Sequence, residues 1–192
     1  MAAGKRGRRS PHARSLQVAL MVDIIREDEG EALDYPAMPD GLSDAALSIE
    51  PAAVWQRIES WITHRYGERT VEWITRGPGV FVPRLKPAEL VTVERWSGED
   101  WASEEPARAP EGLMLGDHAY RLTYTVGTDD TPPASVMLAY ARLAEYWAES
   151  DAASAGLTSV TDGDYSFTRA ATAAARALQN SGAADLLRAY RR

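Results

Sequence analysis

The period of the hydrophobic side chains changes twice along this chain, and those changes limit the folds that it can adopt. From about residue 50 to 66, apolar side chains recur at three- and four-residue spacing, which predicts a helix. Between about residues 70 and 127 the period is two, which is typical of antiparallel strands that bury one face. A helical period returns from about residue 133 to 150. The sequence therefore predicts an α+β fold: a small helical bundle with an inserted antiparallel β-sheet or hairpin, and a C-terminal helical arm.

Residues at the ends of these segments support the assignment. Ser48 can cap the first helix, and Gly67 is placed to end it. The clearest strand is Tyr120–Val126, in which every second side chain is apolar and the others are Arg or Thr. A further strand is predicted at residues 90–96. The stretch at residues 98–112, rich in Glu, Pro and Ala, predicts a long polar excursion between strands.

The last part of the chain follows the second long helix. A polar segment at residues 162–167 precedes an alanine-rich stretch at 168–180, which predicts a third helix whose small side chains permit close helix packing. Ser-Gly at 181–182 predicts a break, because glycine readily adopts the left-handed conformation that ends helices. A last turn or two of helix then holds the apolar side chains Leu186, Leu187 and Tyr190.

Charge is unevenly distributed along the chain. The net charge is −7, yet the first 14 residues carry no acidic group and five basic ones, Lys5, Arg6, Arg8, Arg9 and Arg14. The remainder therefore carries −12, which should repel nucleic acid over most of the surface. An acidic run follows, and Pro36 and Pro39 interrupt any helix there. We predict that residues 1–46 are a loosely ordered arm, basic then acidic, whose basic part either stays solvated or contacts phosphates.

Motifs for catalysis or metal binding are missing from the sequence. There is no cysteine, which excludes disulfides, thiol nucleophiles and cysteine-based zinc sites. The three histidines, His12, His64 and His118, lack a second histidine at ligand spacing. The Asp-Gly-Asp run at 162–164 suggests a calcium loop, but its register places Ala173 where a glutamate is needed. We expect no enzyme, no metal and no cofactor, and no apolar run reaches the ~18 residues of a membrane span.

Two features suggest protein contacts. Six Trp and eight Tyr against two Phe is a balance typical of interfaces, because both side chains combine an apolar body with a polar group. Trp96 and Trp101 flank a Ser-Gly-Glu-Asp turn, and they lie either in the core or at a subunit interface. The closing Leu-Leu-Arg-Ala-Tyr-Arg-Arg run is amphipathic, and it either docks on a partner or folds back on its own domain.

The order of these segments resembles the head–tail connector (adaptor) proteins of tailed bacteriophages and phage-like gene transfer agents. The match covers about residues 47–192: a helix, a strand insertion, a second helix, the Gly-Asp-Tyr-Ser-Phe segment, the alanine-rich helix and the closing Leu-Leu-x-x-Tyr-Arg. The resemblance implies a connector domain at 47–182, with a β insertion at about 70–127, and a C-terminal docking segment at 183–192. The excursion at 98–112 makes the insertion longer than the family's pattern requires.

The resemblance also implies a function in virion assembly. Such proteins form a ring, commonly of twelve subunits, beneath the portal protein in the neck between capsid and tail, after assembly in the host cytoplasm. The ring extends the channel through which double-stranded DNA passes, and it is the platform for a stopper or tail-completion protein. The implied portal-binding residues are Leu186, Leu187, Arg188, Tyr190, Arg191 and Arg192. Trp96 and Trp101 would then meet a neighbouring subunit or the next neck protein.

Two other classes of function remain as alternatives. One is a small soluble DNA-binding or regulatory module that uses the basic arm, and DNA affinity that falls steeply with salt would identify it. The other is an enzyme that uses scattered carboxylates such as Glu94 and Asp117, but these residues form no supporting constellation in the sequence.

Overall fold

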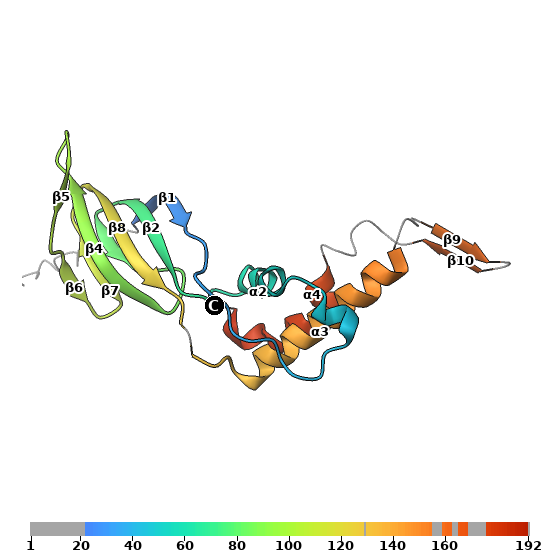
Figure 1. Cartoon of the computed structure of the whole chain (residues 1–192). Helices are drawn as coiled ribbons and strands as arrows, with labels where there is room; N and C mark the ends of the chain where they lie inside the picture. Colours follow the sequence, from blue (N-terminus) through green and yellow to red (C-terminus); the bar gives the residue numbers. More distant parts are fainter. Residues whose placement is uncertain (1–21, 129, 155–158, 163–164, 169–175, 192) are drawn as a thin grey trace, which may run out of the picture.

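The structure is a computed structural model, and it describes residues 22–128, 130–154, 159–162, 165–168 and 176–191. The fold is mixed α+β, as predicted. Figure 1 shows an elongated molecule with strands β1 to β8 at one end and the helices at the other. The chain leaves the helical part after α2 (Pro51–Glu59), forms strands β2 to β8, and returns at α3 (Ala134–Ser154).

Two antiparallel sheets form the β part. The larger has the strand order β1-β2-β8-β4-β5. Its strands are β1 (Asp23–Glu29), β2 (Arg69–Arg76), β8 (Ala119–Val126), β4 (Ala88–Trp96) and β5 (Trp101–Ser103). The smaller has the order β3-β7-β6, with β3 (Gly79–Phe81), β7 (Gly112–Leu115) and β6 (Ala107–Ala109). Because side chains from both sheets fill one shared core, the two sheets form a small β-sandwich.

Strand β8 lies at the centre of the larger sheet and confirms the predicted alternation. Its buried side chains are Tyr120, Leu122, Tyr124 and Val126. The residues between them are half-buried on the opposite face. The ring of Trp73 on β2 lies 5.3 Å from the Tyr124 ring and 5.6 Å from the Phe81 ring, measured between centroids. Aromatic side chains from three strands therefore fill the centre of the β-sandwich.

The polar stretch at residues 98–112 is not a simple excursion. It contains β5, β6 and the first residue of β7. Strand β5 folds back on β4, so that Trp101 lies opposite Trp96, while β6 pairs with β7 in the other sheet. Strands β5 and β6 are three residues long and largely exposed, so their sequence lacks the alternation that reveals a buried face.

The acidic half of the predicted N-terminal arm is built into the fold. Strand β1 pairs with β2 at the edge of the larger sheet, and α1 (Asp44–Leu47) follows. The Ser43 hydroxyl caps α1 by accepting a hydrogen bond from the Ala46 amide at 3.2 Å. The prediction of loose order is therefore wrong over β1 and α1. The sequence did not reveal β1, because this strand is largely exposed and its side chains show no alternation. The basic part of the arm lies outside the described residues.

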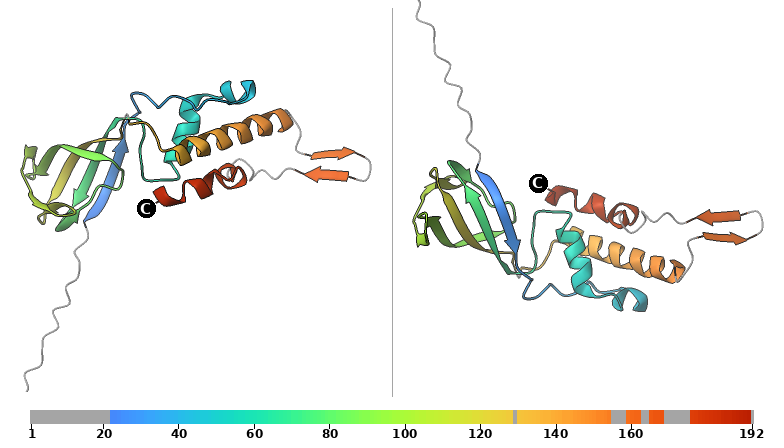
Figure 2. Two further views of the ribbon diagram at one scale, coloured as in Figure 1. Left: turned by 90° about the horizontal axis from the view of Figure 1, so that it is seen from below. Right: turned by 90° about the horizontal axis from the view of Figure 1, so that it is seen from above.

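The helical part is built around α3, which lies between α2 and the C-terminal helices (Figure 2). The buried side chains of α3 are Val136, Ala139, Tyr140, Leu143, Ala144 and Ala148. The C-terminal helices are α4 (Ala177–Asn180), α5 (Ala183–Leu186) and the 3-10 turn η1 (Arg188–Tyr190). Within the described residues, the predicted bundle is thus one long helix with short helices packed on it, and the protein is richer in sheet than expected.

Helix α2 is shorter than predicted. Its N-cap is Glu50 and not Ser48, and it ends at Glu59 and not near residue 66. The Glu59 carboxylate accepts hydrogen bonds from the backbone N–H groups of Tyr66 and Gly67, at 2.6 and 3.3 Å. These bonds hold the chain in an irregular segment in which Tyr66 is still buried. The apolar period therefore predicted burial correctly, but it could not show where the helix ends.

Strands β9 (Ser159–Asp162) and β10 (Tyr165–Thr168) pair as an antiparallel hairpin beyond the end of α3 (Figure 1). The Tyr-Ser-Phe part of the polar segment at 162–167 is thus a strand. The helix predicted at 168–180 is confirmed only as α4, because Thr168 ends β10 and residues 169–175 lie outside the described part. Gly182 follows α4 with a φ of 73°, so the predicted break is confirmed.

Candidate functional site

Four charged side chains meet where the β-sandwich joins the helical part. They are Glu29 on β1, Glu59 at the end of α2, Arg65 in the segment after α2, and Arg69 on β2, and we call them the junction cluster. Glu59 is 2% exposed, Arg69 6% and Arg65 9%. Charges this deeply buried destabilise a fold unless each has a partner.

Each charge of the junction cluster has an opposite partner. Arg65 donates to both oxygens of the Glu29 carboxylate, from Nε at 2.7 Å and from Nη2 at 3.0 Å. Arg69 bridges the two carboxylates, with Nη1 at 2.8 Å from Glu29 and Nη2 at 2.7 Å from Glu59. Because the planar guanidinium matches carboxylate oxygens in this geometry, the bonds are strong and directional. The cluster is neutral overall and fixes two strands against the end of α2.

The ionised forms are favoured in the junction cluster. Burial alone would raise the pKa of the Glu29 carboxyl, but the hydrogen bonds and charges of Arg65 and Arg69 outweigh it and hold that pKa below its ordinary value. Burial would lower the pKa of Arg69, and the charge of Glu59 reverses this, so the pKa of Arg69 is raised. Both shifts keep the ions charged near neutral pH, which suits a structural link between the two parts of the molecule.

Sequence reasoning missed the junction cluster. Glu29 lies 30 positions or more before the other three residues of the cluster. Glutamate and arginine side chains are typical of a protein surface when they are considered one at a time. One signal was present: Glu59 lies four residues after Trp55 and three before Ile62, both of which belong to the apolar stripe. A carboxylate at a stripe position predicts a buried charge that needs a partner.

The C-terminal segment folds back on its own chain. Leu187 is fully buried in the helical core, and Leu186 is half-buried against it. The Tyr190 hydroxyl lies 3.1 Å from the hydroxyl of Ser135 on α3. Of the two arrangements that the sequence left open, the structure therefore has the self-docked one.

The arginines of this segment lie at its surface. The guanidinium of Arg191 sits 4.3 Å from the centroid of the Trp61 ring, a cation–π contact. Arg188 and Arg191 are both exposed, and Arg192 lies outside the described residues. Among the described residues of the predicted portal-binding set, Arg188 and Arg191 are thus the exposed side chains.

Trp96 and Trp101 lie on the outer side of the β-sandwich and not in its core. Their ring centroids are 5.2 Å apart across β4 and β5. Trp96 is 39% exposed, and Trp101 is half-buried under the guanidinium of Arg121, which lies 5.0 Å from its ring. The structure therefore removes the core alternative for this pair and leaves it as a possible interface.

Ion pairs cross the same outer face. Arg121 bonds Glu94 at 2.7 Å and lies 4.0 Å from Glu72, which in turn pairs with Arg26 at 2.9 Å. Hydrogen bonding to Arg121 lowers the pKa of Glu94. These charges are largely compensated, and the two tryptophans contribute apolar surface that this face can offer a partner.

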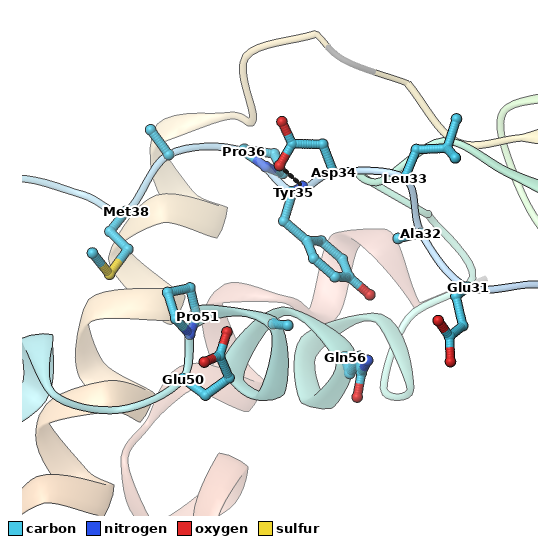
Figure 3. Close-up of a pocket in the computed structure, with 12 residues that line it drawn as sticks. Glu31, Ala32, Leu33, Asp34, Tyr35, Pro36, Met38, Glu50, Pro51 and Gln56 are labelled. Atoms are coloured by element: carbon cyan, nitrogen blue, oxygen red, sulfur yellow. Dashed lines mark hydrogen bonds between the residues drawn. The ribbon is translucent and has the colours of Figure 1, made fainter.

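A groove of about 700 Å³ lies between residues 31–38 and the start of α2 (Figure 3). The Trp55 indole N–H donates to the carbonyl of Pro36 at 3.0 Å, and the Tyr35 ring stacks on Trp55 with an interplanar angle of 3°. These contacts hold the wall of the groove against the helix. Three exposed carboxylates lie along it, Glu31, Asp34 and Glu50, and we call it the acidic groove.

The described residues contain no group of three His, Asp or Glu side chains able to hold a metal ion. His64 packs on Tyr66 with ring centroids 4.5 Å apart, and burial lowers its pKa. Glu94 is paired with an arginine, while Asp117 is exposed in a turn. No described helix is long and apolar enough to cross a membrane. His12 lies outside the described part of the chain.

No protein-family model, curated protein or solved structure matches this chain. Its function therefore has to be argued from its own residues and from the order of its elements.

Proposed function

We propose that this protein is a head–tail adaptor: a ring-forming structural protein of a virion neck that performs no catalysis. In this proposal it docks on the portal protein, extends the DNA channel and provides the platform for a stopper or tail-completion protein. Its place is the neck between capsid and tail, and it is assembled in the host cytoplasm.

The observation that carries the proposal is the position of the β-sandwich within the chain. Strands β2 to β8 lie between α2 and α3, and α3 is followed by the β9–β10 hairpin and the C-terminal helices. The strand insertion between two helices and the helical C-terminal end belong to the order of elements on which the resemblance to connector proteins rests, whereas the hairpin is not part of that order. In this proposal, the helical part takes the place of the small bundle of the connector domain.

The shape of the subunit supports a linking role. The helices and the β-sandwich have separate hydrophobic cores and lie at opposite ends of the molecule (Figure 2). One end can therefore contact the portal while the other contacts a neighbour or the tail side. The acidic body suits a DNA channel, because phosphates find few cations to hold them.

Portal docking by the C-terminal segment has to start from the exposed arginines. Leu187 lies in the helical core and is reached only if the segment leaves α3. Arg188 and Arg191 are exposed already and can form charge-assisted bonds to carboxylates of a partner. We therefore assign the first contact with the portal to these two side chains.

The test is a mass measurement by light scattering, on the full chain alone and mixed with the portal protein of the same particle. The double variant R188A/R191A removes the two exposed arginines and leaves every buried side chain in place, although it loses the contact of Arg191 with Trp61. The control is R76A/R84A, because it removes two exposed arginines of the β-sandwich. We expect the portal complex to form with the unchanged chain and the control, and to weaken about tenfold or more with R188A/R191A.

A chain that stays monomeric and does not bind the portal protein would contradict the proposal. If the same chain bound duplex DNA with an affinity that fell steeply with salt, the DNA-binding or regulatory function would replace it. Equal weakening by both double variants would show that the C-terminal segment is not the docking element.

A further inference from the structure

We propose that the acidic groove binds the basic arm, residues 5–14, of a second copy of this chain. The inference rests on the proposed ring, because it requires copies of the protein to meet. It adds to that proposal the contact by which neighbouring subunits recognise each other, and it assigns a role to two segments that the adaptor function does not use.

The acidic groove and the basic arm carry complementary charges. Among the described residues, Glu29, Glu59, Glu72 and Glu94 are held in ion pairs. Other exposed carboxylates, such as Glu99 and Glu105, form none, and Glu31, Asp34 and Glu50 differ from these because all three lie along one groove. The arm carries five cations and no anion. A basic segment is therefore the partner that would neutralise this groove, with charge-assisted hydrogen bonds.

The acidic groove is already formed in the chain without a partner. Its volume of about 700 Å³ lies within the range of binding pockets, which is roughly 300–1,000 Å³. Figure 3 shows the Tyr35 ring between the residue 31–38 segment and α2, with Met38 and Pro51 near one end. Leu33 beside it is 84% exposed, which offers apolar surface next to the carboxylates. A preformed groove saves a binding segment the cost of ordering both partners.

The position of the groove along the chain favours an arm from another copy over the chain's own arm. The groove starts after the end of β1, while the arm precedes its beginning, and β1 spans seven residues or about 23 Å. For the arm to reach the groove of its own chain, residues 15–22 would have to reverse direction immediately before β1 and run alongside the whole strand. Fully extended, these residues span ~26 Å, so nearly all of their length would be used to cover the length of β1. Residues 20–25 contain no glycine, asparagine or proline for such a tight reversal. The arm of a neighbouring copy needs neither this tight reversal nor this full extension.

The natural lack of cysteine allows a direct test. One copy carries Ser10→Cys in the arm, and another carries Ala37→Cys, an exposed position in the groove. The two full-length proteins are mixed under mild oxidation, and disulfide-linked heterodimers are counted on a denaturing gel. The control replaces A37C with A102C, an exposed position on β5. We expect a high yield for Ser10 with Ala37, a low yield for Ser10 with Ala102, and a fall in the first yield at high salt.

Charge variants then test the recognition itself. Neutralising the groove with E31Q/D34N/E50Q in the A37C copy should lower the yield about tenfold. The matched control, E99Q/E105Q/D117N, removes the same charges from exposed positions of the β-sandwich and should leave the yield unchanged. Circular dichroism of each variant confirms that it is folded.

Two results would overturn the inference: equal yields at positions 37 and 102, or a yield that the groove variant does not lower. A disulfide that forms only when S10C and A37C are in one chain would mean that each arm occupies its own groove. Because this test uses the chain without the portal, it can fail while portal binding stands, and portal binding can fail while the crosslink forms.

Discussion

Replacing Glu59 by glutamine should destabilise this protein far more than the same change at Glu94. Each carboxylate accepts a hydrogen bond from an arginine at 2.7 Å, from Arg69 and Arg121 respectively. The side chains of the first pair are 3% and 6% exposed, and those of the second are 26% and 30% exposed. The two variants therefore compare a buried ion pair with a partly exposed one at equal distance.

The expected losses follow from the contacts. Removing one partner of a buried pair costs about 3–5 kcal/mol, because the other charge is left uncompensated. In E59Q the amide oxygen can still accept from the Tyr66 backbone N–H, and Arg69 keeps Glu29 at 2.8 Å, so we expect the low end, about 3 kcal/mol. For E94Q the exposed pair gives a loss of about 1 kcal/mol or less.

Urea denaturation followed by tryptophan fluorescence measures both free energies of unfolding. A double-mutant cycle with Arg69→Met separates the pair from its surroundings. Because Arg69→Met leaves the Glu59 carboxylate without its arginine, and E59Q leaves Arg69 with Glu29 as its one carboxylate partner, the double variant should lose less than the two single losses together, by about 2 kcal/mol. A loss below about 1 kcal/mol for E59Q, equal losses for E59Q and E94Q, or simple additivity in the cycle would refute the role given to the junction cluster.

Urea denaturation also tests three further sets of substitutions, the last of them together with light scattering. Leu187→Ala should cost about 2–5 kcal/mol, because the side chain is fully buried, and Leu186→Ala should cost clearly less; equal losses would mean that the C-terminal segment does not dock on α3. Since the pKa of Glu29 is lowered in the folded protein, its carboxylate contributes stability that is present above the ordinary pKa of 4.5 and is lost as pH falls further. Glu29→Gln should therefore lose less stability than the unchanged protein on acidification below pH 4.5, and parallel losses would contradict this. Trp96→Ala and Trp101→Ala should change stability by about 1 kcal/mol or less yet reduce self-association in light scattering, and unchanged association would exclude them from a subunit interface.

Local pattern predicted the parts of the fold in which one face meets one core. The alternation in β8 and the stripe of α3 both report burial directly, because side-chain direction repeats with the backbone period. The break at Gly182 was readable for a similar reason, since a left-handed residue ends a helix in any surroundings. In contrast, β1 and β5 are largely exposed edge strands, so their pairing depends on neighbours that the local sequence does not contain.

For the candidate binding surfaces too, the sequence indicated residue types, and the structure decided where those residues lie. The sequence singled out Trp96 and Trp101 by their type, but only the structure places them outside the core. It marked the C-terminal segment as amphipathic, but an amphipathic helix fits its own domain or a partner equally well, and packing on α3 decided which. The acidic groove could not be predicted from the sequence, because its walls come from a loop and a helix that meet only in the folded chain.

The sequence by itself determined the α+β class, the central strand, the long helix and the uneven charge, because each follows from residue type and spacing alone. Tertiary structure decided the end of α2, the junction cluster, the self-docked C-terminal segment and the groove. Each of these depends on contacts between residues far apart in the chain, whose energies arise only when burial removes water and brings a specific partner within bonding distance.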